Sequence, residues 1–315
     1  MDISSVCIVG GSGFVGRAVA DHLCARGLRV RVLTRSRPRA MAIAVLPTAE
    51  IEVVNPHDAN ELARAFENMD AVVNLVGILN EGGGRTFRGA HVELPRRVVQ
   101  ACHAAGVQHL LLMSALGASA SGPSLYQRSK AEGEGAIRAT AGILPVTFFR
   151  PSVIFGEGGG FIELFATLVR HLPVIALARA DTRFQPIWVE DVARCFADAL
   201  GNPGAFGKTY ELGGPKVYTL REIVRFVSDT LGRRRVIVGL PASLGYLQAL
   251  ALEMLPGKLM TRDNLASMGV DNVCAAPFPA DFGFKPAPLE AVVPEYLAAS
   301  AARARYSRYR NLAGR

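Results

Sequence analysis

The sequence predicts an α/β protein with a doubly wound parallel sheet and a smaller, mostly helical C-terminal cap. Three observations support this fold class. Short apolar runs alternate with helix-like segments of about a dozen residues over the first two-thirds of the chain. A cluster of glycines, residues 10–16, separates the first run from the first helix-like segment. Beyond residue 216 the alternation fades and helix-like segments dominate.

The strands of the predicted sheet are short apolar or alternating runs. They cover residues 6–9, 29–34, 51–54, 71–76, 109–114 and 146–149. The helices between and after them are expected at residues 17–27, 59–66, 93–105, 126–140 and 161–171. Gly27 is the expected C-cap of the first helix, and Asp58 is the expected N-cap of the second. Strands that alternate with helices of this length are expected to lie parallel.

The later segments are less regular. A turn and short strand at 185–192 lead into a helix at 193–200, followed by an amphipathic helix at 220–231 and an apolar helix at 240–254. Residues 277–288 are rich in Pro and Phe, and their apolar residues follow neither a helical nor a strand spacing. We therefore divide the chain into parts, which are a core at 1–155, a cap insertion at 156–183, a return to the core at 184–215, a C-terminal cap at 216–300 and an Arg-rich tail at 301–315.

Composition and charge limit the classes of protein and partner. Hydrophobic residues make up 50% and charged residues 20% of the chain, which excludes a disordered protein. The formal net charge of +8 favours anionic partners such as nucleotide phosphates, acidic lipid headgroups or an acidic subunit. No basic run is interleaved with aromatic residues along a helix, so nucleic acid is not an expected partner.

Cysteine spacing and hydropathy indicate the compartment. The five widely spaced cysteines indicate neither a disulfide framework nor a zinc site, and the histidines fit no paired-ligand spacing, so no metal is expected. No signal-like segment opens the chain. The longest uncharged stretch, 236–252, is interrupted by glycines and a proline and is shorter than a bilayer span of roughly 20 residues. We expect a cytoplasmic protein with no transmembrane segment.

The glycine cluster fits the pattern GxxGxxG between a strand and a helix. Gly10 permits a tight turn, Gly13 lets the backbone approach a pyrophosphate, and Gly16 lets the helix pack against the strand. The helix N-terminus then presents N–H groups to the phosphates. The sequence therefore predicts a Rossmann-type NAD(P)-binding core. The expected cofactor contacts in this loop are Gly10, Gly11, Ser12, Gly13, Phe14, Val15 and Gly16.

The end of the second predicted strand indicates which dinucleotide is preferred. A site for NAD(H) carries an acidic residue there, whereas this chain has Thr34, Arg35, Ser36 and Arg37. A carboxylate would repel a 2′-phosphate, while a guanidinium binds it with charge-assisted hydrogen bonds. We therefore expect NADP(H) to be preferred over NAD(H), with Arg35 as the main phosphate ligand and Arg37 beside it. The alternative is that both arginines are solvated loop charges.

Tyr126 and Lys130 form a YxxxK pattern and lie one helical turn apart. A nearby ammonium favours the phenolate, so Lys130 is expected to lower the pKa of Tyr126 for general acid/base chemistry. Lys130 can also hydrogen-bond a nicotinamide ribose. Ser114 ends the fifth predicted strand and is expected to polarise a substrate carbonyl. These three residues are the candidate catalytic group. Glu132 and Glu134, further along the helix, are expected on its solvated face.

On these motifs, residues 6–198 resemble the short-chain dehydrogenase/reductase superfamily in its extended and atypical, epimerase-like branches. Residues 240–273 resemble one subgroup, the accessory-subunit family of respiratory complex I of the alpha-subcomplex subunit nine type, with its bacterial relatives. The resemblance implies binding of NADP(H) and, in mitochondria, a position where the peripheral and membrane arms join. Asp58 resembles an adenine-contacting acid, although its N-cap role explains it equally well. Further cofactor contacts implied are Val76, Gly77, Arg150, Pro151 and Val153.

Two departures from the family pattern bear on turnover. Extended enzymes carry an Asn where this chain has His91, which either caps a helix or replaces the Asn in a proton relay. The segment before Tyr126, residues 115–125, is short and made mostly of small residues, unlike the longer polar loop of enzymes acting on sugar nucleotides. The resemblance thus implies cofactor binding more strongly than turnover.

Three functions remain open. The first is an NADP(H)-binding protein of the complex I accessory-subunit type or of quinone metabolism. It would retain its dinucleotide structurally or turn it over slowly, and would dock on a respiratory complex or on acidic lipid at the inner face of the membrane through the helix at 240–254 and the basic tail. The second is an active NADP-dependent oxidoreductase or epimerase that uses Tyr126 and Lys130 on a carbonyl or alcohol. The third is a regulator that senses NADP(H).

Overall fold

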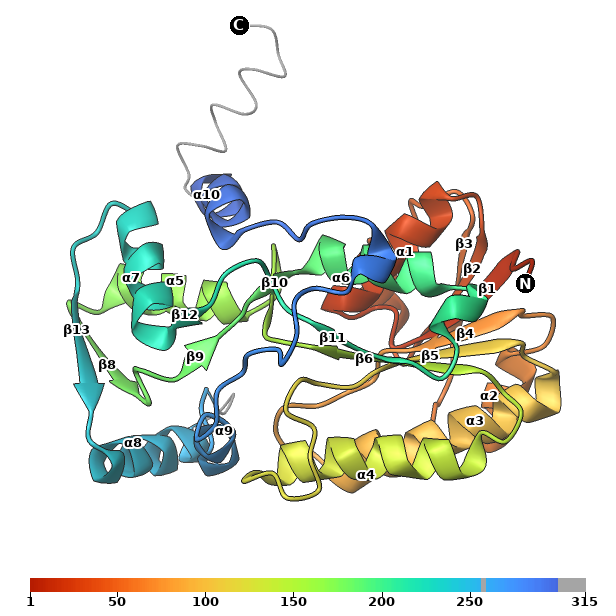
Figure 1. The fold of residues 1–315 in the computed structure, drawn as a ribbon, viewed down its shortest axis with the longest axis horizontal. Helices are drawn as coiled ribbons and strands as arrows, with labels where there is room; N and C mark the ends of the chain where they lie inside the picture. The colour runs from red at the N-terminus through yellow and green to blue at the C-terminus, as the bar shows by residue number, and fades with distance from the viewer. Residues whose placement is uncertain (256–258, 300–315) are drawn as a thin grey trace, which may run out of the picture. The chain divides into compact units, whose positions relative to one another are not determined.

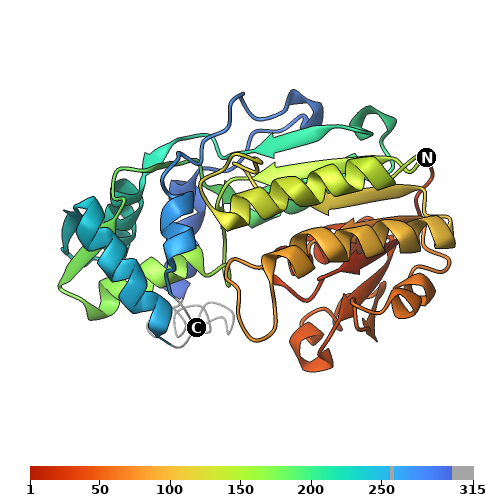
Figure 2. The ribbon, with the colours of Figure 1, turned by 90° about the horizontal axis from the view of Figure 1, so that it is seen from below.

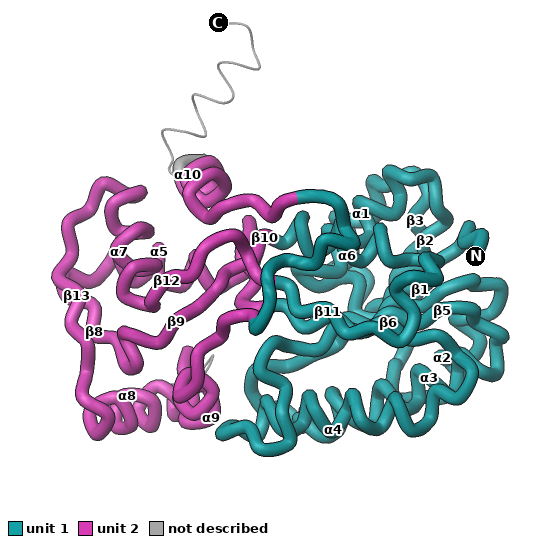
Figure 3. Tube along the Cα trace, in the orientation of Figure 1, with its two compact units in different colours: residues 1–151, 189–212, 275–284 teal, residues 152–188, 213–274, 285–315 magenta. Residues whose placement is uncertain are grey.

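The computed structural model describes residues 1–255 and 259–299 and divides the chain into two compact units (Figure 3). Unit 1 comprises residues 1–151, 189–212 and 275–284, and unit 2 comprises residues 152–188, 213–274 and 285–315. The domain boundaries given above stay a prediction, and the basic tail at 301–315 lies outside the described residues. None of the described helices is long and apolar enough to cross a membrane.

Unit 1 is built on a parallel sheet of seven strands in the order β11-β6-β5-β4-β1-β2-β3. The predicted α/β fold class is therefore confirmed. The strand order reverses between β1 and β4, and in such sheets ligands bind beyond the carboxyl ends of the strands at this point. The strands are β1 (Ser5–Val9), β2 (Arg29–Thr34), β3 (Ala49–Val53), β4 (Ala71–Asn74), β5 (His109–Met113), β6 (Val146–Pro151) and β11 (Thr209–Leu212).

Helices cover both faces of this sheet (Figures 1 and 2). One face carries α1 (Phe14–Ala25) and α6 (Val189–Ala199). The other carries α2 (Ala59–Ala65), α3 (Leu94–Ala105) and α4 (Leu125–Thr140), over a core that includes the fully buried Phe66, Leu94 and Phe148. Short 3₁₀ segments are η1 (Arg37–Ala40), η3 (Pro203–Ala205) and η4 (Ala280–Phe282).

Several elements begin earlier than the sequence pattern predicts. Helix α1 starts at Phe14 and α6 at Val189, because a glycine loop and a short strand lead directly into them. A π-helical turn, η2 (Gly89–Glu93), precedes α3 and contains His91. Strand β11 was not predicted, since its residues alternate too briefly to show a period. It pairs with β6 at the edge of the sheet.

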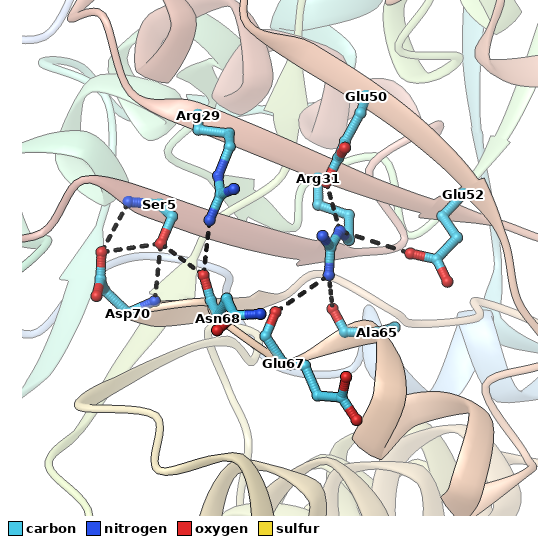
Figure 4. A network of polar contacts seen from close by, with 9 residues as sticks. All are labelled: Ser5, Arg29, Arg31, Glu50, Glu52, Ala65, Glu67, Asn68 and Asp70. Carbon is cyan, nitrogen blue, oxygen red and sulfur yellow. Dashed lines mark hydrogen bonds and ion pairs between the residues drawn. The ribbon is translucent and has the colours of Figure 1, made fainter.

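A network of polar contacts joins the first halves of β1 and β2 to the edge strand β3 and to the chain before β4 (Figure 4). The Asp70 carboxylate accepts hydrogen bonds from the Ser5 N–H at 2.9 Å and the Ser5 hydroxyl at 2.8 Å. The Arg31 guanidinium forms ion pairs with Glu50 and Glu52 of β3. The arginines at this end of the sheet therefore have partners within the protein.

Unit 2 is mostly helical, as predicted, with three pairs of short strands. Its helices are α5 (Phe161–His171), α7 (Leu220–Thr230), α8 (Ala242–Met254), α9 (Arg262–Ser267) and α10 (Leu289–Ala299). The strand pairs are β7 (Ile154–Phe155) with β10 (Ile187–Trp188), β9 (Arg183–Phe184) with β12 (Tyr218–Thr219), and β8 (Val174–Ala178) with β13 (Val236–Leu240). Residues of α5, α7 and α10 form the core of the unit. The predicted apolar helix at 240–254 is α8, which begins only after Pro241 because Leu240 still belongs to β13.

Candidate functional site

The glycine loop follows β1 and has the geometry that its sequence predicts. Gly10 has φ +84°, and a Cβ there would lie 3.0 Å from Val76 Cγ2, two residues beyond the end of β4. A Cβ on Gly16 would lie 2.5 Å from the Gly11 backbone, so the close approach that Gly16 permits is to the loop itself. The corresponding Cβ on Gly13 meets only the Gly10 carbonyl, at 3.3 Å. Two of the three glycines are therefore required by the fold itself, while Gly13 leaves its backbone accessible.

The N-terminus of α1 is suited to an anion. Its N-cap is Gly13, no side chain caps it, and its first turn contains no acidic residue. The first N–H groups of a helix have no acceptor within the helix, and they carry a partial positive charge. Ser12 joins this loop to the end of β2, because the Thr34 hydroxyl donates to Ser12 Oγ at 3.1 Å. The residues present thus fit a pyrophosphate.

Arg35 and Arg37 follow the carboxyl end of β2 and are exposed. Their side chains have no hydrogen bond or ion pair with any residue that the structure describes. Arg39 of η1 is a third exposed cation in this segment, which sequence reasoning did not single out. The cluster of arginine charge is thus larger than the two predicted ligands.

Asp58 is the N-cap of α2, as predicted. Its carboxylate accepts hydrogen bonds from the backbone N–H groups of Asn60 at 2.8 Å and Glu61 at 3.2 Å. This capping accounts for the residue within the protein. Contact with an adenine stays a prediction.

Tyr126 and Lys130 lie in the first turns of α4. The helix starts at a capping box formed by Ser124 and Gln127, which places Tyr126 in its first turn. Lys130 is buried, and its Nζ donates to the carbonyl of Met113 at 3.3 Å. Burial lowers the pKa of Lys130 to about 8, and the charge of Glu134 acts in the opposite direction.

The residues Val76 and Gly77 continue the chain beyond β4. Val76 lies next to the glycine loop, and Gly77 lies next to Lys130. The Val76 side chain approaches Gly10, as described above, and its N–H donates to Asn74 Oδ1 at 3.1 Å. A Cβ on Gly77 would lie 3.2 Å from Lys130 Nζ. Gly77 therefore leaves room for the ammonium group. The structure brings the glycine loop, the end of β4 and Lys130 together within unit 1.

The Tyr126 phenol does not have the low pKa that the sequence predicted. Burial raises the pKa of Tyr126 to about 12. Its ring makes edge contacts with His91, at a centroid distance of 5.5 Å, and with Phe87, at 6.0 Å. The expectation that Lys130 lowers this pKa is therefore wrong for this structure, because aromatic and apolar surroundings disfavour the phenolate.

Ser114 follows β5 directly. Its N–H donates to the Phe149 carbonyl at 2.7 Å, while its buried hydroxyl has no hydrogen-bond partner in the described part of the chain. Ser114 is one of the residues that line a cavity of about 10 Å³, together with Lys130, His91 and Val76. A buried polar atom without a partner carries a desolvation cost of about 1–3 kcal/mol, so this hydroxyl is available to a polar group that enters.

His91 joins the loop after β4 to helix α4. Its Nε2 accepts a hydrogen bond from the Ile78 N–H at 3.1 Å, so the ring proton is on Nδ1, which donates to Ser129 Oγ at 2.8 Å. Ser129 in turn donates to the carbonyl of Tyr126 at 2.8 Å. Burial, with the nearby charge of Lys130, lowers the pKa of His91 to about 2. His91 is neutral.

This arrangement corrects one expectation about His91. The histidine side chain caps no helix, because it lies inside the π-helical turn η2 with both ring nitrogens engaged elsewhere. A Cβ on Gly133 of α4 would lie within 1.9 Å of the His91 carbonyl oxygen, so only glycine lets α4 cross this turn. A part in a proton relay stays a prediction.

Arg150 and Glu134 form a paired contact. Arg150 Nε and Nη2 donate to the two oxygens of Glu134 at 2.9 and 2.8 Å. The Glu134 side chain is 4% exposed, so its expected place on a solvated helix face was wrong. The carboxylate raises the pKa of Arg150. Its role as a cofactor contact stays a prediction, and within the protein its guanidinium holds the helix that carries Lys130.

The last two predicted contacts lie in different units. Pro151 ends β6 in unit 1, where its carbonyl accepts the Leu116 N–H at 2.9 Å. Val153 belongs to unit 2, where its N–H donates to Asn272 Oδ1 at 3.1 Å. Both have partners that account for them structurally, and contact with a dinucleotide stays a prediction for each.

The fold and the glycine loop define a dinucleotide-binding protein of the Rossmann class. The pattern of the NAD(P)H-binding family matches residues 10–203, and the chain belongs to this family. The match covers more than half of the chain, and its range includes the glycine loop, the arginine segment and the YxxxK helix.

Two curated proteins show which members of this family the chain is similar to. The chain is 28% identical over 300 residues to the mitochondrial NADH dehydrogenase (ubiquinone) 1 alpha subcomplex subunit 9 of Rattus norvegicus, covering 90% of this chain and 77% of the rat protein. It is 29% identical over 251 residues to the ceramide reductase of Caulobacter vibrioides, covering 75% and 73% of the two chains. The resemblance to the subunit nine type is thereby confirmed.

Solved structures support the fold. The NADPH-dependent quinone oxidoreductase QOR2 of Escherichia coli, solved with NADPH, superposes with a TM-score of 0.73 at 20% identity, covering 93% of this chain and 99% of that chain. At this identity the likeness establishes the fold alone.

Proposed function

We propose that the protein binds NADP(H) in preference to NAD(H) and retains it structurally or turns it over slowly. The observation that carries the proposal is the pair of exposed arginines, Arg35 and Arg37, which follow β2 and lack side-chain partners among residues 1–255 and 259–299. They adjoin Thr34, whose hydroxyl contacts the glycine loop. Guanidinium groups in this place would bind a 2′-phosphate.

The remaining contacts of the dinucleotide follow from the same arrangement. The loop from Gly10 to Gly16 and the start of α1 would hold the pyrophosphate, and Lys130 would hold the nicotinamide ribose beside Val76 and Gly77. When bound, the nicotinamide supplies hydride transfer. Retention needs no substrate, because a ligand that binds only the folded state stabilises it by about 2.7 kcal/mol at 100 times its Kd.

Calorimetry on nucleotide-free protein tests the preference. NADPH is expected to bind at least tenfold more tightly than NADH. Tighter binding of NADH would contradict the role of Arg35 and Arg37, and an absence of heat with both reduced dinucleotides would contradict dinucleotide binding at this loop.

Slow turnover is supported by the state of Tyr126. With a pKa of about 12, its deprotonated fraction at pH 7 is on the order of 10⁻⁵, so it serves poorly as a base for oxidising an alcohol. Under this proposal the protein is an accessory to a respiratory NADH dehydrogenase or to quinone metabolism, as the name of the rat relative suggests.

A working reductase is the second candidate, and the Ser114 hydroxyl favours it. This buried hydroxyl lacks a partner in the described chain and lines a cavity with Lys130, as a group that polarises a carbonyl would. A Tyr126 that stays protonated is suited to donate a proton during reduction. The relative named as a ceramide reductase is consistent with this direction of reaction, and an epimerase would need the same three side chains.

The two candidates differ in a turnover assay. The protein is incubated with NADPH and a panel of carbonyl compounds that includes quinones, and Tyr126→Phe is compared. Turnover that is lost in Tyr126→Phe while NADPH still binds supports the reductase. No turnover in either protein supports structural retention of the dinucleotide. If the protein is instead a regulator that senses NADP(H), a partner molecule should bind it with different affinities in the presence of NADPH and of NADP⁺.

We also propose a cytoplasmic location with peripheral attachment to the inner face of the membrane. Helix α8 is apolar, and Leu244 and Leu247 are 50% and 57% exposed. The net charge of +8 would favour acidic lipid or an acidic respiratory subunit. Membranes are isolated at low and at high salt and probed for the protein. Recovery only in the soluble fraction at low salt would contradict attachment.

A further inference from the structure

Unit 2 contains a pocket of about 600 Å³ that is lined by none of the residues assigned to the dinucleotide. The end of β8, the turn after it, the end of β13 and the start of α8 form its wall. Small-molecule sites have volumes of roughly 300–1,000 Å³, so the pocket is large enough for a ligand. Much of the wall consists of small residues, which are Ala178, Ala180, Gly239, Ala242 and Gly245.

Two of these small residues lie in close contact with other parts of the wall. A Cβ on Gly239 would lie 2.7 Å from Arg221 Nη2, so this glycine makes room for a guanidinium. A Cβ on Gly245 would lie 3.0 Å from Ala178 Cβ, so glycine favours the close approach of α8 to β8. The pocket is therefore an outcome of how α8 packs on the strand pair.

The charges in the wall leave one arginine uncompensated. Asp271 is paired with Arg183 at 2.7 Å, and Asp181 is paired with Arg221 at 3.3 Å. Arg179 also lines the pocket and is exposed, and its side chain has no ion pair or hydrogen bond within the described ranges. The lining thus contains two arginines and two aspartates, and of these four charges Arg179 alone has no ion-pair partner among the described residues.

The backbone of Arg179 is in a conformation that favours glycine. Its φ is +54°, in the left-handed region that bulky residues rarely adopt. Glycine would occupy this position without strain. Strained residues persist where the surrounding structure holds them, and they cluster at ligand sites. An unpaired guanidinium held in the wall of a pocket in this way indicates a role in binding.

One part of the wall is apolar, and the polar Thr182 also lines the pocket. Leu240, Pro241 and Leu265 line the pocket, together with Tyr246, which is half exposed. We propose that this pocket binds a small anionic molecule that carries an apolar chain, with the anion at Arg179 and the chain along Leu240 and Leu265. This site is independent of the dinucleotide proposal, since none of the residues that line it is assigned to the dinucleotide.

Octyl phosphate, titrated calorimetrically into the full-length protein below its micelle concentration, tests the proposal. It is expected to bind at a single saturable site, more tightly than inorganic phosphate and more tightly than octylammonium. Arg179→Gly is expected to weaken this binding at least tenfold. Because glycine suits φ +54°, the variant is expected to melt at the wild-type temperature or above, so that lost binding cannot reflect misfolding.

The matched control is Arg225→Gln, an exposed arginine of α7 outside the pocket, which is expected to keep wild-type affinity. Equal affinity of wild type and Arg179→Gly for octyl phosphate would overturn the proposal. Equal binding of octylammonium would overturn the anionic part of it, and equal binding of inorganic phosphate would overturn the apolar part.

Discussion

Arginines lie at the start of strand β2 and just after its end, and the two groups differ in whether their side chains have partners within the protein. At its start, Arg29 donates to the Asn68 carbonyl at 2.8 Å, and Arg31 contacts two glutamates and the carbonyl of Ala65 (Figure 4). After its end, the side chains of Arg35 and Arg37 have no such partner in the described chain. An arginine with internal partners stabilises the fold, whereas one left exposed beside a glycine loop is free to bind an anion.

Arg150 shows that sequence position alone does not separate these roles. The family resemblance implied that it contacts the cofactor, yet its guanidinium is paired with the buried Glu134 of α4. The comparison therefore predicts that substitutions of partnered arginines change stability, while substitutions of Arg35 and Arg37 change affinity for NADPH.

The largest effect is expected from Arg150→Met. It leaves the Glu134 carboxylate buried without the arginine that binds both of its oxygens. Breaking such a pair costs about 3 kcal/mol of unfolding free energy or more. The double variant Arg150→Met, Glu134→Gln is expected to recover part of this loss, because no buried charge remains unpaired. Urea unfolding measures both. A single variant as stable as wild type would contradict the structural role of Arg150.

The second effect concerns affinity alone. Arg35→Gln with Arg37→Gln is expected to weaken NADPH binding by about 10- to 100-fold, the equivalent of roughly 1.5–3 kcal/mol for charge-assisted hydrogen bonds. NADH binding and the melting temperature of the free protein should stay unchanged. Arg64→Gln, an exposed arginine of α2, serves as the control. A similar loss for NADH and NADPH would show that these arginines do not read the 2′-phosphate.

The third prediction concerns the buried, neutral His91 beside Lys130. Its folded pKa of about 2 is below the ordinary 6.5, so between these values the unfolded chain binds a proton that the folded chain does not. The stability that neutral His91 contributes is present above pH 6.5 and falls with pH, by about 2 kcal/mol at pH 5.

The variant His91→Asn removes this dependence. Between pH 7 and pH 5, wild type is expected to lose about 2 kcal/mol more unfolding free energy than the variant. The buried His109, whose pKa is also lowered, is present in both proteins, so its contribution cancels. Chemical unfolding at the two pH values measures the difference. Parallel pH dependence would contradict a buried neutral His91.

The smallest effect is expected from Arg31→Gln. This change removes ion pairs to partly exposed glutamates and a hydrogen bond to a carbonyl, at an expected cost of about 1 kcal/mol. NADPH affinity should not change, because Arg31 lies at the opposite end of β2 from the glycine loop. Weaker NADPH binding in Arg31→Gln would contradict the distinction between arginines that stabilise the fold at the start of β2 and arginines that bind NADPH after its end.

The parts of the fold that could be predicted are those with a clear hydrophobic pattern among neighbouring residues. Strands β1, β2, β4, β5 and β6 and the helices between them have strong periodicity, and the α/β class follows from their alternation. The pair β8 and β13 has no such signal, since each strand is defined by a partner about sixty residues away. The π-helical turn η2 also escaped prediction, because it reflects how His91 packs against α4 and not any local preference.

The sequence by itself determined the fold class, the glycine loop and the spacing of Tyr126 and Lys130, because turns, helix starts and i, i+4 pairs depend on neighbouring residues. The tertiary structure alone decided which charged side chains have partners. It buried Glu134 against Arg150 and left the Ser114 hydroxyl without a partner in the described chain. Burial and pairing depend on residues far apart in the chain, and these set whether a pKa rises or falls and whether an arginine is free to bind a ligand.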